Sequence, residues 1–82
     1  MLTAEIRITL KDGVLDPQGT TLRRSLETLG FAGAGEVRVG KFIQVSFGHG
    51  DQARARAEAE AMCSKVLANP VIEQYRIEIR EA

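Results

Sequence analysis

The side chains that could carry out chemistry are few and lie far apart in the sequence. The single histidine, His49, lies in a Gly-His-Gly-Asp turn, and the single cysteine is Cys63. A metal site or a nucleophilic centre needs several such groups held together, for example a thiol beside a base. We therefore expect His49 to be a solvated loop residue and Cys63 to be a packed core thiol.

The loop 11–16 (KDGVLD) is a second candidate, because a glycine before a helix N-terminus can cradle a phosphate. Its spacing matches no phosphate loop, and Asp16 already occupies the helix N-terminus as a cap. A structural turn is the better interpretation. The sequence offers no carboxylate pair, triad or metal cluster, so the chain looks like a binding or assembly module.

The composition indicates one globular domain, 1–82, since 82 residues are too few for more. Eleven Lys and Arg balance eleven Asp and Glu, which argues against a dedicated nucleic-acid binder. The apolar runs are too short for a membrane span, no signal-peptide pattern opens the chain, and one cysteine cannot form an internal disulfide. These features predict a cytoplasmic protein.

Apolar spacing and helix-end signals predict five elements in the order β-α-β-α-β. A strand over 4–11 alternates strictly, a helix runs from Asp16-Pro17 to Gly30, and a second helix covers roughly 52–68 between a cap at Asp51 and a stop at Asn69-Pro70. We expect an α+β fold, an open sandwich with both helices packed on one face of a small sheet. The side chains expected inside are Leu22, Leu26, Leu29, Ala55, Ala59, Met62, Val66, Tyr75, Ile77 and Ile79, with Cys63 and Leu67 beside them.

In the stretch 36–47 the odd positions carry the apolar residues Val37, Val39, Ile43, Val45 and Phe47, and Lys41 is the only charged residue among these odd positions. A two-residue turn at Gly40-Lys41 would split these residues between two faces, which register logic disfavours. A three-residue loop at 40–42 or one continuous, bent strand keeps them together, and we favour the strand. The charge of Lys41 on that face, with Arg38 nearby, predicts a bend, a partner chain or a bound anion.

The length of this stretch also predicts self-association. A compact domain of this size has a radius of gyration near ~12 Å and a diameter of about 30 Å. Twelve extended residues span roughly 40 Å. The strand must overhang or bend at Gly40, and an apolar overhang favours pairing with a second copy. We expect a homodimer, or a dimer of dimers, built through the sheet.

Three blocks of this sequence resemble the signatures of the PurS family, the small subunit of phosphoribosylformylglycinamidine (FGAM) synthase. They are 9–19 (TLKDGVLDPQG), 37–43 (VRVGKFI) and 63–73 (CSKVLANPVIE), and their order and spacing match. The likeness covers nearly the whole chain. It implies that the structural or interface positions are Asp16, Pro17, Gly19, Arg38, Gly40, Lys41, Asn69 and Pro70.

The resemblance further implies a non-catalytic assembly subunit of a glutamine- and ATP-dependent carbon–nitrogen ligase in purine biosynthesis. The implied partners are the synthetase subunit (PurL) and the glutaminase subunit (PurQ), which this subunit docks so that ammonia can pass between them. The resemblance implies no catalytic group and no cofactor on this chain, while the complex uses ATP and Mg²⁺. The alternatives are a stand-alone small-ligand regulatory domain and a small phosphoryl or acyl-phosphate hydrolase.

Overall fold

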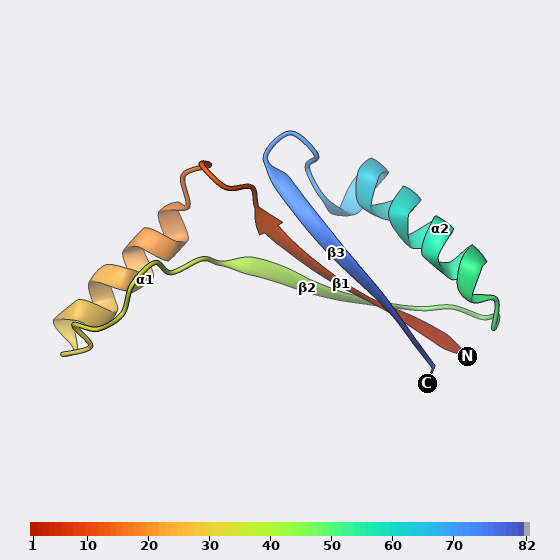
Figure 1. The fold of residues 1–82 in the computed structure, drawn as a ribbon, viewed down its shortest axis with the longest axis horizontal. Coiled ribbons are helices and arrows are strands. Elements are labelled where there is room, and N and C mark those ends of the chain that lie inside the picture. Colours follow the sequence, from red (N-terminus) through yellow and green to blue (C-terminus); the bar gives the residue numbers. More distant parts are fainter. Residues whose placement is uncertain (82) are drawn as a thin grey trace.

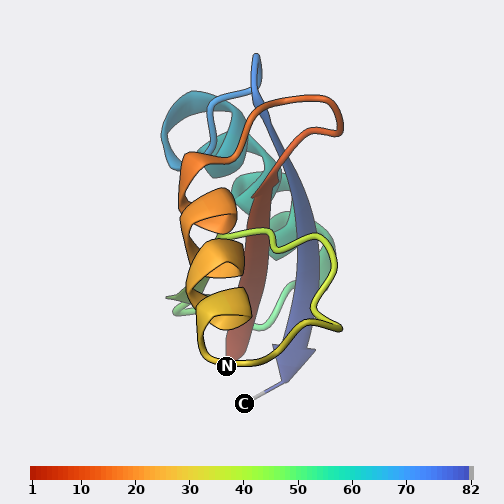
Figure 2. The same cartoon turned by 90° about the vertical axis from the view of Figure 1, so that its left-hand side faces the viewer.

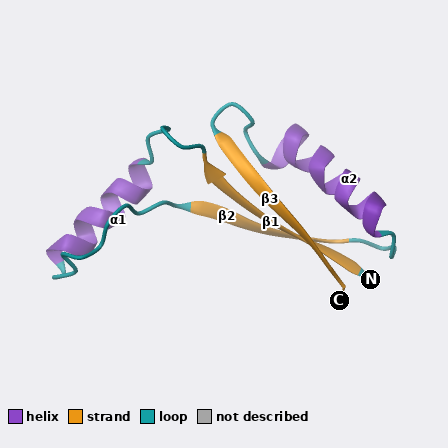
Figure 3. Cartoon of the chain, in the orientation of Figure 1, coloured by secondary structure: helices purple, strands orange, loops and turns teal. Residues whose placement is uncertain are grey.

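Strand β1 (Leu2–Leu10) lies at the centre of a three-stranded antiparallel sheet, between β2 (Gly40–Ser46) and β3 (Glu73–Glu81). The computed structural model describes residues 1–81, and Figure 3 shows its secondary structure. Helix α1 (Pro17–Thr28) follows β1, and α2 (Gln52–Met62) follows β2. The predicted α+β class and element order are confirmed.

One face of the sheet forms the core. Ile6 lies opposite Ile43 on one neighbouring strand and Ile77 on the other, so the apolar residues of all three strands share this face. Helix α2 covers it (Figure 1). The fully or almost fully buried apolar residues are Leu2, Ala4, Ile6, Ile8, Phe47, Ala55, Ala59, Cys63 and Ala68.

Helix α1 does not pack on the sheet, and in this respect the prediction of two helices on one face is wrong. Figure 1 shows α1 beyond the end of the sheet, and Figure 2 views the molecule from that end. Leu22 is 48% exposed and Leu29 is 72% exposed, although both belong to the stripe expected inside. We call residues 16–39, which comprise α1 and the extended segment that returns along it, the arm. The arm makes the chain elongated, 48 × 28 × 14 Å, with a radius of gyration of 16.1 Å.

The stretch 36–47 contains no turn at Gly40-Lys41, so the argument against a two-residue hairpin is confirmed. The strand itself is shorter than predicted and begins at Gly40. Among residues 1–81 no strand lies beside 36–39, because β1 ends at Leu10 and the chain then turns into the loop before α1. Ile43 and Val45 pack against the core as expected.

The second helix ends in a π-helical turn, η1 (Cys63–Leu67), in which the Ala68 N–H donates to the Cys63 carbonyl at 3.0 Å. A π turn holds more residues than an α turn and therefore rotates the side chains that follow. Leu67 then faces the core and Val66 is 80% exposed, so the prediction of a buried Val66 is wrong. Within residues 1–81, neither helix combines the length and the apolar surface that a membrane crossing requires.

Candidate functional site

The candidate residues from the sequence gather at one end of the sheet, where β1 ends and where β2 and β3 begin. We call this region the signature junction. The arm leaves the sheet at this point, so the junction sets the arm's direction. Its members are Asp16, Pro17, Gly19, Arg38, Gly40, Lys41, Asn69 and Pro70.

Asp16 begins α1 and also fixes the segment that returns from it. Its Oδ1 accepts the Gly19 N–H at 2.8 Å, and its Oδ2 accepts the Val39 N–H at 2.8 Å. Pro17 follows at the first helical position, as predicted. The hydrogen bond from Val39, then that from Gly19, and also the nearby charge of Arg38 lower the pKa of the Asp16 carboxyl. The carboxylate is buried and stays ionised, so it joins the two sides of the arm.

Two glycines permit close backbone contacts in the junction. A Cβ at Gly19 would lie 2.0 Å from the Val37 carbonyl oxygen, and one at Gly40 would lie 2.5 Å from the Ile8 carbonyl oxygen. Neither contact leaves space for a side chain. The first glycine lets the segment 36–39 lie against α1, and the second lets β2 start beside β1.

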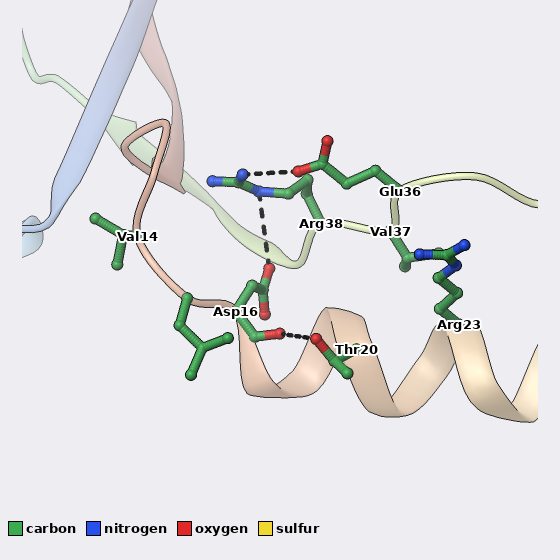
Figure 4. A pocket seen from close by; sticks show the side chains of 8 residues that line it. Val14, Asp16, Thr20, Arg23, Glu36, Val37 and Arg38 are labelled. Carbon is green, nitrogen blue, oxygen red and sulfur yellow. Dashed lines mark hydrogen bonds and ion pairs between the residues drawn. The ribbon is translucent and has the colours of Figure 1, made fainter.

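Arg38 ties the loop after β1 to the arm, and Figure 4 shows its side chain beside Glu36 and Asp16. Its Nη2 donates to the carbonyls of Leu10 at 2.8 Å and Lys11 at 3.2 Å, and its Nη1 donates to Glu36 at 2.9 Å. The hydrogen bond that Arg38 donates to the Glu36 carboxylate is the main reason that the pKa of Arg38 is raised. A cavity of about 240 Å³ lies beside these groups, lined by Val14, Leu15, Asp16, Thr20, Arg23, Glu36, Val37 and Arg38. The guanidinium orders the chain's own backbone, and an anion or assembly role for it stays a prediction.

Lys41 links β2 to the start of β3. Its Nζ lies 3.7 Å from Glu73 Oε2 and donates to the Leu67 carbonyl at 3.4 Å. It occupies the core face opposite Ile8, at the end that α2 does not cover. The charge of Lys41 is tolerated on the apolar face because the Glu73 carboxylate and the Leu67 carbonyl oxygen of the same chain lie close to its ammonium group. Glu73 was not singled out in the sequence. Its position four residues after Asn69, within reach of the Asn69 N–H, was the signal that could have identified it.

Asn69 and Pro70 form the turn that starts β3. Asn69 Oδ1 accepts the Val71 N–H at 3.1 Å, and the Asn69 N–H donates to Glu73 at 2.7 Å. Lys11 Nζ donates to the Pro70 carbonyl at 2.7 Å, which fastens this turn to the end of β1. The junction is thus one hydrogen-bonded unit made from three distant parts of the chain.

The prediction that His49 is a solvated loop residue is wrong, because its ring contacts three other residues of the chain. Its ring packs against Phe47 with 5.4 Å between centroids, and its Nε2 lies 3.1 Å from Glu58 Oε1. Its Nδ1 accepts the Asp51 N–H at 3.2 Å. The neutral tautomer with a proton on Nε2 satisfies both contacts. His49 therefore fastens the β2–α2 turn to α2, a contact that the sequence did not reveal because it depends on the direction of the helix.

Cys63 is fully buried, as predicted, and burial, with a smaller effect of Glu60, raises the pKa of its thiol. Within residues 1–81, no group of three or more His, Cys, Asp and Glu side chains could hold a metal ion. The ionised groups of the junction are bonded to backbone or to each other. This arrangement can hold the arm in place and present surfaces to other chains.

Comparison with known proteins gives one family. The family model PurS, phosphoribosylformylglycinamidine (FGAM) synthase, matches residues 3–81. The PurS subunit of this synthase from Synechocystis is 43% identical over 74 residues, which are 90% of this chain and 74% of the relative. The subunit from Methanocaldococcus jannaschii is 41% identical over 81 residues, which are 99% of this chain and 98% of the relative.

Solved structures give the same family. The crystal structure of M. jannaschii PurS, described as one of the subunits of formylglycinamide ribonucleotide amidotransferase in the purine biosynthetic pathway, matches with a TM-score of 0.91 and 40% identity. That match covers 100% of this chain and 99% of the other. A chain in the structure of PurLQS from Thermotoga maritima matches with a TM-score of 0.82 and 28% identity, covering 100% of this chain and 99% of that one.

Proposed function

This chain belongs to the PurS family of phosphoribosylformylglycinamidine synthase, and we propose that it is the non-catalytic assembly subunit of that ligase in purine biosynthesis. It docks the glutaminase subunit to the ATP-dependent synthetase subunit and helps ammonia to pass between them. The observation that carries this proposal is the family match over 3–81, in a chain whose signature side chains bond to its own backbone.

The physical need for such a subunit follows from the chemistry of ammonia. Ammonia released into water near neutral pH is protonated and diluted before it can react. Holding the two enzymes together and excluding water from the path between them prevents both losses. In this proposal the synthetase subunit uses ATP and Mg²⁺ and this cytoplasmic chain binds neither.

The arm supports the further proposal that the subunit acts as a homodimer, or a dimer of dimers, built through the sheet. Leu22, Leu29 and Phe31 are exposed on the arm, and residues 36–39 extend β2 without a neighbouring strand. Apolar surface of this kind is stabilised when another chain covers it. Light scattering at micromolar concentration is expected to give at least a dimer. A strict monomer contradicts this part, and Leu29→Lys is expected to shift the equilibrium towards monomer.

Reconstitution with the cognate synthetase and glutaminase subunits tests the assembly role. Removing this chain is expected to abolish or sharply reduce amidine formation from glutamine. Synthesis driven by a high concentration of ammonium salt is expected to fall much less, because bulk ammonia does not need the docked path. Equal loss of both rates indicates that the chain supports the synthetase active site instead. No loss of either rate refutes the assembly role.

A further inference from the structure

The face of the sheet opposite α2 carries charged residues in rows across the strands. Arg7 on β1 lies directly opposite Arg76 on β3, and in the next row Glu5 lies opposite Glu78. Like charges placed opposite each other in an antiparallel pair are destabilising. The acidic row is compensated, because Arg80 bonds to both Glu5 and Glu78.

The arginine row is not compensated to the same degree. Among residues 1–81, Arg7 forms a single ion pair, with Glu78 at the long distance of 3.8 Å, and its guanidinium lies 5.0 Å from the centre of the Phe42 ring. Among residues 1–81, the Arg76 guanidinium forms no ion pair and no hydrogen bond. The arginine row therefore holds two cations, and the Glu78 carboxylate that lies near Arg7 is also bonded to Arg80. The row keeps an excess of positive charge.

A hollow of about 360 Å³ lies at this row, lined by Arg7, Thr9, Gln74, Tyr75 and Arg76. Gln74 Nε2 donates to Thr9 Oγ1 at 3.3 Å. The Thr9 hydroxyl accepts this bond and keeps its own hydrogen to donate outward, and the Gln74 amide keeps a second N–H. We call this hollow the open-face groove. It presents two guanidinium groups, a hydroxyl and an amide, and none of the acids in the described part of the chain lines it.

We propose that the open-face groove receives an aspartate or glutamate carboxylate from an acidic segment of a partner subunit, with Phe42 contacting the apolar part of that segment. This inference rests on the proposed assembly function and deepens it. A carboxylate between Arg7 and Arg76 offsets their mutual repulsion and can accept hydrogen bonds from both strands. The local charge is not a general property of the chain, whose net charge is zero.

The openness of the groove favours a protein carboxylate over a free small anion. Arg7, Phe42 and Arg76 are exposed, so a free anion here stays surrounded by water that screens the arginines. A partner chain lying over the face excludes that water and strengthens the same charge pairs. Complementary charge of this kind mainly sets the rate and the specificity of docking.

The charge reversal Arg76→Glu tests the proposal, because it removes the like-charge row and leaves the core face untouched. The measurement is the dissociation constant of the wild-type and variant chains for the cognate synthetase and glutaminase subunits, at low and physiological salt. The constant is expected to rise at least ~10-fold, which corresponds to about 1.4 kcal/mol, and to depend less on salt. The variant's Tm is expected to stay equal or to rise.

Lys65→Glu is the matched control, since it makes the same charge change at an exposed side chain of η1. It is expected to leave the dissociation constant within about twofold of wild type, because surface charges far from the contact have little effect. If Arg76→Glu does not fold, Arg76→Gln takes its place with the same measurement.

Three results overturn the proposal. The first is binding by Arg76→Glu that equals wild type. The second is loss of self-association in light scattering, which assigns the face to a second copy of the chain. The third is a change in the chemical shift of the Arg76 Nε–H that reaches saturation at submillimolar inorganic phosphate, which makes the groove a small-anion site. If the wild-type chain itself binds neither subunit, the proposed assembly function is refuted together with this inference.

Discussion

The Asp16 carboxylate accepts a hydrogen bond of 2.8 Å from the backbone N–H of Val39, 23 residues further along the chain. The same carboxylate caps α1 through Gly19. One buried side chain therefore closes the arm at its base, where α1 leaves the sheet and the chain returns to β2. The arm has no sheet beneath it, so this bond is a large part of what fixes its position.

The hydrogen bonds that Asp16 accepts lower the pKa of its carboxyl. The contribution of Asp16 to the stability of the folded protein should therefore decrease at acidic pH. The folded-state pKa lies below the ordinary value of 3.8. The contribution is thus complete at neutral pH and is lost as the pH falls below about 4 and through the folded-state pKa. At pH 7, Asp16→Ala is expected to lower the Tm by roughly 4–8 °C, the change that loss of one N-cap gives in a domain of this size.

Thermal melts of wild type and Asp16→Ala from pH 7 down to pH 2 check this expectation. The gap between the two Tm values should narrow below about pH 4, since the protonated carboxyl no longer holds its charge-assisted bonds. A gap that stays constant over this range shows that ionised Asp16 does not stabilise the arm.

Gly19→Ala should destabilise the protein, although the same change within an exposed helix normally stabilises it by about 1 kcal/mol. The new Cβ would lie 2.0 Å from the Val37 carbonyl oxygen and push the returning segment off α1. We expect a loss of about 1–3 kcal/mol in the free energy of unfolding, measured by urea denaturation. Gly33→Ala is the control, because nothing lies within 4 Å of its Cβ position. A gain in stability for Gly19→Ala disproves the close contact.

Lys41→Met should leave the fold intact and weaken assembly. The substitution removes an ion pair with Glu73 whose lysine is largely exposed, and such pairs contribute about 0–1 kcal/mol. The methionine still packs along the path of the lysine stem. Arg54→Met is the matched control, since it removes the exposed ion pair with Glu58 on α2. If both variants assemble and support glutamine-dependent synthesis like wild type, Lys41 has no role in assembly.

The Cys63 thiol should be unreactive in the native protein. Burial raises its pKa, so the thiolate fraction at pH 8 is lower than for a free cysteine, and the reagent has no access to the sulfur. Ellman's reagent is expected to label it only when denaturant is added. Fast labelling without denaturant indicates that α2 opens readily, and Cys63→Ala, with no thiol, gives the reagent blank.

Features that depend on near neighbours in the chain could be predicted from the sequence. The caps at Asp16 and Asp51 and the left-handed Gly30 after α1 were predictable because each acts within one helical turn. Val37 and Val39 share odd parity with Ile43, Val45 and Phe47, and this argued against a two-residue hairpin because side chains alternate along a strand. The signature blocks identified the family and its junction residues, but not how those residues contact one another.

Which apolar surface is covered and which charged groups meet depend on how distant parts of the chain pack together. The stripe of Leu22, Leu26 and Leu29 shows that α1 has an apolar face, but an amphipathic pattern does not say what packs on it. The pairing of His49 with Glu58 and the opposition of Arg7 and Arg76 depend on helix direction and strand register. These are set by contacts between residues far apart in the chain, and no local pattern records them.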